Sequence, residues 1–116
     1  MKHLPLILLC LLAFFFLKKR FFDNTDYKAM MNSGGIIIDV RSEAEFYSGH
    51  IENSFNIPLG DLPSRLDYLK DKDQAIITCC ASGVRSAGAQ KLLWAKGYTN
   101  VINGGGWSNL ESKLGN

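Results

Sequence analysis

Short apolar runs alternate with segments of helical periodicity along most of the chain. The apolar runs are rich in Ile and Val, which is typical of strands buried on both faces, and they predict strands at 36–38, 55–57, 75–79 and 101–102. The intervening segments carry helix signals: N-cap residues before 27–31, a Ser42-x-x-Glu45 capping box opening a helix through Tyr47, leucines spaced three and four apart over 59–69, and Gly97 ending a helix over 86–96.

Alternation of buried strands with helices predicts an α/β domain, in which helices flank both faces of a mainly parallel sheet. In such sheets, ligands bind beyond the carboxyl ends of the strands. Two polar segments lie at predicted strand ends, 39–41 and 80–85. The search for a functional site therefore narrows to these two segments.

The N-terminal segment has a different character. Residues 4–17 form an uncharged apolar run of 14 residues, preceded by Lys2 and followed by three basic residues at 18–20. A helix of this length covers about 21 Å, less than the roughly 30 Å hydrocarbon core, although snorkelling lysines shorten the gap. Small residues expected before a signal-peptide cut are missing, so we favour an uncleaved membrane anchor over a cleaved signal peptide or a buried core helix. We therefore divide the chain into an anchor or signal segment, 1–20, and a folded domain, 21–116.

The position of basic residues bears on orientation and on partners. Of the 13 Lys and Arg residues, four lie in the first 20 positions, and the remaining nine are outnumbered by the 11 Asp and Glu residues. The basic cluster after the apolar run favours a domain facing the cytoplasm, with export to a periplasm as the alternative. The folded part is mildly acidic, which argues against a nucleic-acid-binding surface. A hydrophobic fraction of 47% and three cysteines exclude disorder and a disulfide-dense scaffold.

The segment from Cys80 to Arg85 is the strongest candidate for a catalytic site in the sequence. A cysteine ends an apolar strand, a small Gly-containing loop follows, and a helix comes next. Backbone N–H groups of such a loop, the helix N-terminus and the fixed charge of Arg85 all favour a thiolate over a thiol. Comparable settings lower a cysteine pKa from about 8.5 by one to several units. The pattern therefore predicts a nucleophilic Cys80 that needs no neighbouring base.

Five motifs in order resemble those of the single-domain rhodaneses, which are thiosulfate-type sulfurtransferases. They are IDVRSEAEFYSGHI ending at Ile51, NIPL at 56–59, CASGVRS at 80–86, KGYTNV at 96–101 and NGGGW at 103–107. The likeness covers 36–110, about two thirds of the chain. The short chain with its apolar leader is similar to the small, exported phage-shock-type rhodaneses.

The resemblance implies a mechanism and a set of partners. Cys80 would take the sulfane sulfur of a small anion such as thiosulfate, release sulfite, and pass the sulfur from its persulfide to cyanide or a thiol. Ala81, Ser82, Gly83, Val84 and Arg85 would bind the substrate, with the backbone N–H groups stabilising charge. Arg85 would hold the sulfonate end of the donor, with bracing of the loop as its alternative role. No metal or organic cofactor is implied.

Loop length separates the branches of this superfamily. Six residues from Cys to Arg go with sulfur, and seven go with phosphate or arsenate in related phosphatases and arsenate reductases. The loop from Cys80 to Arg85 has six. The alternatives are a relay module that hands sulfur to a protein thiol and, disfavoured by the loop length, a Cys-based phosphatase or arsenate reductase.

Asp39, Arg41 and Ser86 are expected to support the loop. Asp39 and Arg41 are interpreted as a partly buried ion pair that fixes local geometry. For Glu45, bracing of Arg41 and capping of its own helix are both open.

Three further side chains invite a functional reading. His50 could pair with a thiol, but the matching histidine of rhodaneses belongs to a structural turn. Cys79 should point away from Cys80 because neighbours alternate along a strand, although a resolving thiol is the alternative. Trp107 either lines the pocket or packs under it.

Overall fold

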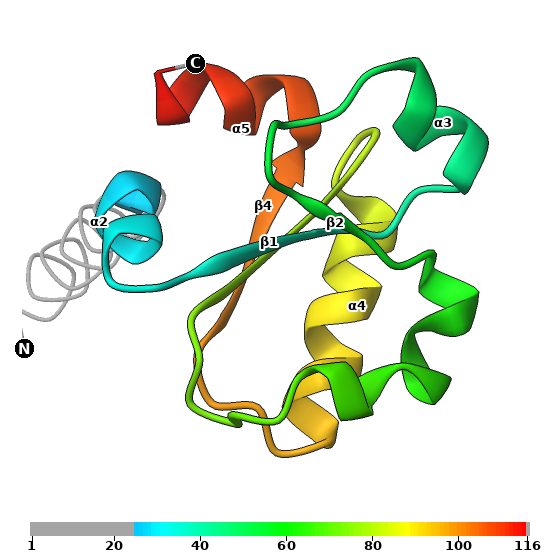
Figure 1. Cartoon of the computed structure of the whole chain (residues 1–116), viewed down its shortest axis with the longest axis vertical. Coiled ribbons are helices and arrows are strands. Elements are labelled where there is room, and N and C mark those ends of the chain that lie inside the picture. The colour runs from blue at the N-terminus through cyan, green and yellow to red at the C-terminus, as the bar shows by residue number, and fades with distance from the viewer. Residues whose placement is uncertain (1–24, 116) are drawn as a thin grey trace, which may run out of the picture.

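A computed structural model describes residues 25–115 of the chain. Four strands form one sheet in the order β2-β1-β3-β4, and every neighbouring pair is parallel. Figure 1 shows this sheet with helices on both of its sides. The elements in chain order are α2 (Tyr27–Asn32), β1 (Ile36–Asp39), α3 (Glu43–Ser48), β2 (Phe55–Asn56), the 3₁₀ helices η1 (Leu59–Ser64) and η2 (Leu66–Tyr68), β3 (Ile76–Cys80), α4 (Val84–Ala95), β4 (Val101–Gly106) and α5 (Trp107–Leu114). The predicted α/β class and parallel sheet are confirmed.

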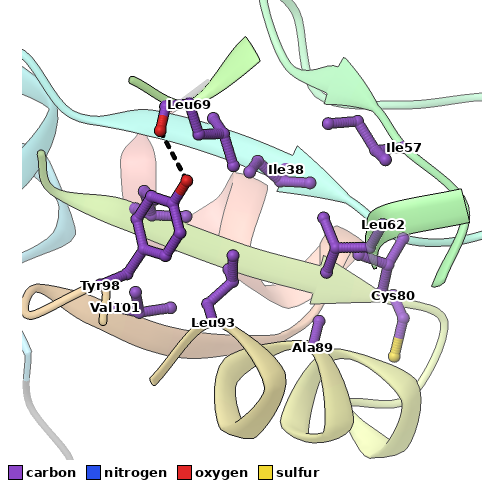
Figure 2. Close-up of a cluster of buried hydrophobic side chains, with 11 residues drawn as sticks. Ile38, Ile57, Leu62, Leu69, Cys80, Ala89, Leu93, Tyr98 and Val101 are labelled. Atoms are coloured by element: carbon purple, nitrogen blue, oxygen red, sulfur yellow. Dashed lines mark hydrogen bonds between the residues drawn. The ribbon is translucent and has the colours of Figure 1, made fainter. Parts of the chain in front are cut away.

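The two faces of the sheet carry separate hydrophobic clusters. Ile38, Ile76 and Cys80 face the larger cluster, which α4 and the two 3₁₀ helices complete. Figure 2 shows this cluster, including the hydrogen bond of 2.6 Å that the Tyr98 hydroxyl donates to the Leu69 carbonyl. Ile77 and Cys79 point to the opposite face, where the smaller cluster includes side chains of α2 and α5. The sheet is therefore buried on both faces, as its continuous apolar strands require.

The predicted α-helix over 59–69 is wrong in type. The segment forms two successive 3₁₀ helices separated at Arg65. Pro63 has no backbone N–H to donate and its ring would clash with the carbonyl of Leu59 in an α-helix. The leucine spacing nevertheless identified the inward face, because Leu62 and Leu69 are buried in the larger cluster.

The boundaries around the candidate loop also differ from the prediction. β3 extends to Cys80 and α4 begins at Val84, two residues earlier than expected, so the connection between them is 81–83. The helix N-terminus consequently lies closer to the thiol than the sequence pattern suggested.

β4 is longer than predicted and reaches Gly106, because its glycines fit where side chains would not. A Cβ at Gly104 would lie 2.7 Å from Ile77 Cγ2 and 2.9 Å from Leu110 Cδ2. The glycine run thus continues the strand against β3 and α5 before α5 begins, and α5 itself was not predicted.

The predicted membrane anchor or signal segment, residues 1–20, lies outside the described residues. Within 25–115, no helix has the length and apolar character needed to cross a membrane.

Candidate active site

Cys80 is the last residue of β3, at the carboxyl edge of the sheet where the sequence placed the site. The chain turns back through Gly83, whose φ of +98° is a backbone conformation that favours glycine. A Cβ there would lie 3.2 Å from the Cα of Gly105, so the loop packs closely on β4. A Cβ at Gly106 would lie 2.9 Å from the Ala81 carbonyl oxygen, which confirms that the glycine run approaches the active loop.

The Cys80 sulfur accepts hydrogen bonds from the loop that surrounds it. The Gly83 N–H donates to Cys80 Sγ at 3.0 Å and the Ser86 N–H at 3.4 Å, while the Ser86 hydroxyl oxygen lies 3.3 Å from the sulfur. The side chain is only 1% exposed. Figure 2 shows the sulfur beyond the end of β3, beside the start of α4.

These contacts decide the charge of the thiol. Burial on its own raises the pKa of Cys80, but hydrogen bonds from the Ser86 hydroxyl and from the backbone N–H groups of Ser86, Ser82 and Gly83 outweigh it. The net result is a pKa below that of an ordinary cysteine. A hydrogen bond to the charged form stabilises that form, so the loop favours a thiolate.

Ser86 is fully buried and belongs to a second layer of contacts behind the sulfur. Its hydroxyl donates to Asn103 Oδ1 at 2.7 Å, and its carbonyl accepts from Thr78 Oγ1 at 2.9 Å. Asn103 also donates to the Gly83 carbonyl at 3.0 Å and accepts from the Gly105 N–H at 2.9 Å. Ser86 was predicted as a supporting residue, but Thr78 and Asn103 were missed.

Asp39 and Arg41 form the buried ion pair expected at the end of β1. Arg41 Nη2 lies 2.7 Å from Asp39 Oδ2, and the two side chains are 5% and 0% exposed. Arg41 also donates to the carbonyls of Glu45 and Gly49, and its guanidinium lies 4.8 Å from the centre of the Trp107 ring. Trp107 therefore packs over a structural ion pair. The pair fixes the segment that leads into α3.

Arg85 pairs with Glu45 at the surface beside the active loop, a place called the mouth of the loop below. Its two terminal nitrogens donate to the two carboxylate oxygens of Glu45 at 2.8 and 2.9 Å. The hydrogen bond from Arg85 lowers the pKa of Glu45 to about 2. Glu45 also completes the predicted capping box with Ser42. The predicted role of Arg85 in substrate binding remains a prediction, and its partnership with Glu45 was missed.

The other residues predicted to bind the substrate lie in the same loop, beside the thiol. Ala81, Ser82 and Val84 are exposed, and Val84 is 77% exposed although its side chain is apolar. Gly83 and Arg85 are half-buried, and substrate binding by residues 81–85 remains a prediction.

Cys79 and His50 take no part in the contacts around the thiol. Burial raises the pKa of Cys79 to about 12, and the side chain lies in the cluster on the opposite face of the sheet. The His50 ring stacks on Phe46 with centroids 3.7 Å apart, and its Nδ1 lies 2.8 Å from the Phe46 carbonyl oxygen. Both observations agree with the structural reading of these two residues.

Comparison with known proteins assigns the fold and loop to a family. The protein-family model of the rhodanese-like domain matches residues 23–113 of this chain. The chain belongs to the rhodanese-like domain family. This rhodanese is 37% identical over 77 residues to YtwF of Bacillus subtilis (strain 168), with 66% of this chain and 74% of that protein covered.

Two further comparisons point the same way. The thiosulfate sulfurtransferase PspE of Escherichia coli (strain K12) is 32% identical over 74 residues, covering 63% of this rhodanese and 71% of PspE. A solved structure described as a rhodanese with anions from E. coli superposes with a TM-score of 0.60 at 34% identity, covering 65% of this chain and 89% of that one. The predicted resemblance to single-domain rhodaneses is confirmed.

Proposed function

We propose that this rhodanese transfers sulfane sulfur through a persulfide on Cys80. The observation that carries the proposal is the hydrogen bond of 3.0 Å from the Gly83 N–H to Cys80 Sγ, in a loop where further N–H groups lower the pKa of the thiol. The sulfurtransferase activity named for PspE supports the same chemistry.

In the first half-reaction, the Cys80 thiolate attacks the outer sulfur of thiosulfate. A bond forms between Sγ and that sulfur, the S–S bond of thiosulfate breaks, and sulfite leaves with the bonding electron pair. The negative charge then lies on the outer sulfur of the persulfide. Backbone N–H groups that stabilise the thiolate would also stabilise this charge, because both are sulfur anions within the same loop.

In the second half-reaction, an acceptor attacks the outer sulfur and restores the thiolate. Cyanide leaves as thiocyanate, and a thiolate acceptor leaves as a new persulfide. Ala81, Ser82 and Val84 are exposed beside the buried Cys80, and this is the side from which a thiol on a small molecule or on a protein would approach. Relay of sulfur to a protein thiol is the alternative form of this function, and it uses the same Cys80 persulfide.

Intact-mass spectrometry of the purified full-length protein after incubation with thiosulfate tests this proposal. We expect a gain equal to the mass of one sulfur atom in the wild type and in Cys79→Ser, and none in Cys80→Ser. Addition of cyanide should remove the extra mass and produce thiocyanate. An adduct that survives in Cys80→Ser would overturn the assignment of the nucleophile.

We also propose that the apolar run at 4–17 attaches the protein to a membrane, with the domain facing the cytoplasm. The support is the sequence pattern alone, an uncharged run followed by three basic residues. Fractionation of cells expressing the full-length protein should place it in the membrane fraction, resistant to high salt and released by detergent. Recovery in the soluble fraction would contradict the anchor, and protease accessibility would report the side.

A further inference from the structure

The guanidinium of Arg85 is already occupied by an acidic side chain of this chain. Both of its terminal nitrogens donate to Glu45, one to each carboxylate oxygen, at 2.8 and 2.9 Å. The two side chains are 39% and 37% exposed, so the pair stands at the surface of the mouth. A guanidinium fork that binds a carboxylate in this bidentate manner presents the same two N–H groups that a sulfonate would use.

An anionic ligand that approaches the loop therefore meets a pair whose charges cancel. A ligand that binds Arg85 must displace the Glu45 carboxylate. A ligand that approaches the thiol beside the pair must pass close to that carboxylate. Either route costs more for a ligand of higher negative charge, because the repulsion scales with the product of the charges. Residue 45 thus controls how much of the positive charge of Arg85 an anionic ligand experiences.

We propose that Glu45 is a specificity-determining residue of this site, whose carboxylate competes with anionic substrates for Arg85 and so disfavours highly charged small anions relative to substrates of lower charge. The proposal rests on the sulfur-transfer function proposed above and deepens it. It predicts that thiosulfate, a dianion, binds less tightly than it would if Glu45 did not pair with the half-buried Arg85.

The chain offers a clean variant and a matched control. Glu45→Gln removes the charge but keeps an oxygen that can accept from the Ser42 N–H, and glutamine is an accepted capping-box residue. Glu43 lies in the first turn of the same helix and is exposed. Glu43→Gln removes one negative charge nearby without touching the Arg85 pair, so it reports the effect of net charge alone.

A pair of alkylating reagents tests the proposal without any sulfur transfer. Iodoacetate and iodoacetamide both form an S–C bond at the Cys80 thiolate and release iodide, but only the first is an anion. In a background that carries both Cys10→Ser and Cys79→Ser, Cys80 is the one remaining thiol of the full chain, so intact mass spectrometry gives the two rates. We expect Glu45→Gln to raise the iodoacetate-to-iodoacetamide rate ratio about fivefold at low ionic strength, and Glu43→Gln to leave it within about twofold. The effect should disappear when Arg85→Gln is also present.

Steady-state kinetics then compares two donors with cyanide as acceptor. Thiosulfate carries two negative charges and releases sulfite, whereas methanethiosulfonate carries one and releases methanesulfinate. In Glu45→Gln we expect KM for thiosulfate to fall about fivefold and KM for methanethiosulfonate to fall less, with kcat within about twofold for both.

The outcomes separate this proposal from its alternatives. An unchanged reagent ratio in Glu45→Gln, or the same rise in Glu43→Gln, would overturn it. A loss of kcat with both donors, without any change in the reagent ratio, would show that the pair merely braces the loop and would also overturn it. A wild type that takes sulfur from neither donor would refute the proposed function, while the reagent ratio would still decide the role of Glu45.

Discussion

Ser86 contacts the Cys80 sulfur twice, through a backbone N–H at 3.4 Å and a hydroxyl oxygen at 3.3 Å. The same hydroxyl lies 2.7 Å from Asn103 Oδ1. A hydroxyl carries one proton, so it donates to only one of these two acceptors at a time. With a neutral thiol, the S–H can donate to the Ser86 oxygen. With a thiolate, the hydroxyl can donate to the sulfur only by giving up its hydrogen bond to Asn103.

Replacing Ser86 with alanine should therefore raise the pKa of Cys80. The variant keeps the backbone N–H but loses the side-chain donor to the thiolate. The pH profile of iodoacetamide alkylation should shift to higher pH, and alkylation at neutral pH should be severalfold slower. Ser82→Ala is the matched control, because only the backbone N–H of Ser82 contributes to the lowered pKa. A profile unchanged in Ser86→Ala would contradict the role of the hydroxyl.

Asn103→Ala should reduce activity by loosening the active loop on the side that faces β4. The change removes the hydrogen bonds that Asn103 makes with Gly83, Gly105 and Ser86, which join β4 to the active loop. We expect about tenfold lower kcat for sulfur transfer to cyanide, together with an altered pH profile, because Ser86 loses its anchor. Asn100→Ala serves as the control, since its side chain is exposed just before β4. Equal activity of the two variants would refute the positioning role of Asn103.

Breaking the buried ion pair should cost stability far more than activity per folded molecule. Asp39→Ala leaves the Arg41 guanidinium buried without its carboxylate, and losing one partner of a buried pair typically costs about 3–5 kcal/mol. Urea denaturation should show the loss as a lower midpoint. Glu45→Gln, in the half-exposed pair with Arg85, should move the midpoint much less. A similar midpoint for wild type and Asp39→Ala would contradict the structural reading.

The raised pKa of Cys79 predicts alkaline destabilisation. The folded protein keeps this thiol neutral up to a pKa of about 12, whereas an unfolded chain ionises it above about 8.5. Between these values the folded state binds more protons, so stability falls as pH rises. At pH 10 this difference lowers the free energy of unfolding by about 2 kcal/mol.

Cys79→Ala removes this contribution. Its denaturation midpoint should therefore fall less than that of the wild type between pH 8 and pH 10. Cys80 acts in the opposite direction, because its lowered pKa adds stability as pH rises toward the unfolded value. Identical pH slopes in wild type and Cys79→Ala would show that the Cys79 thiol ionises as freely in the folded protein as in the unfolded chain.

The parts of the site that the sequence predicted are those whose neighbours along the chain determine them. Cys80, Gly83 and Ser86 lie within one strand–loop–helix segment, and Asp39 lies two residues from Arg41, so local spacing identified both groups. The pairing of Arg85 with Glu45 joins residues 40 positions apart, and that of Ser86 with Asn103 joins residues 17 apart. Such contacts depend on how β1, β3 and β4 lie side by side, which a linear motif does not encode.

The errors in the fold have equally local causes. Leucine spacing over 59–69 fits an inward-facing stripe, but periodicity alone did not register that Pro63 breaks the α-helical hydrogen bonding. The predicted strand over 101–102 stopped short of the glycines at 104–106, whereas the close approach of β3, α5 and the active loop makes glycine necessary within the longer β4.

The opposite orientation of Cys79 and Cys80 affects how the protein recovers from oxidation. If peroxide converts Cys80 to a sulfenic acid, the other thiol within residues 25–115 lies across the sheet and cannot close a disulfide with it. Rescue of that sulfenic acid through residues 25–115 therefore requires a thiol from outside this segment. The concentration of external thiols then determines how long a molecule with an oxidised Cys80 remains inactive.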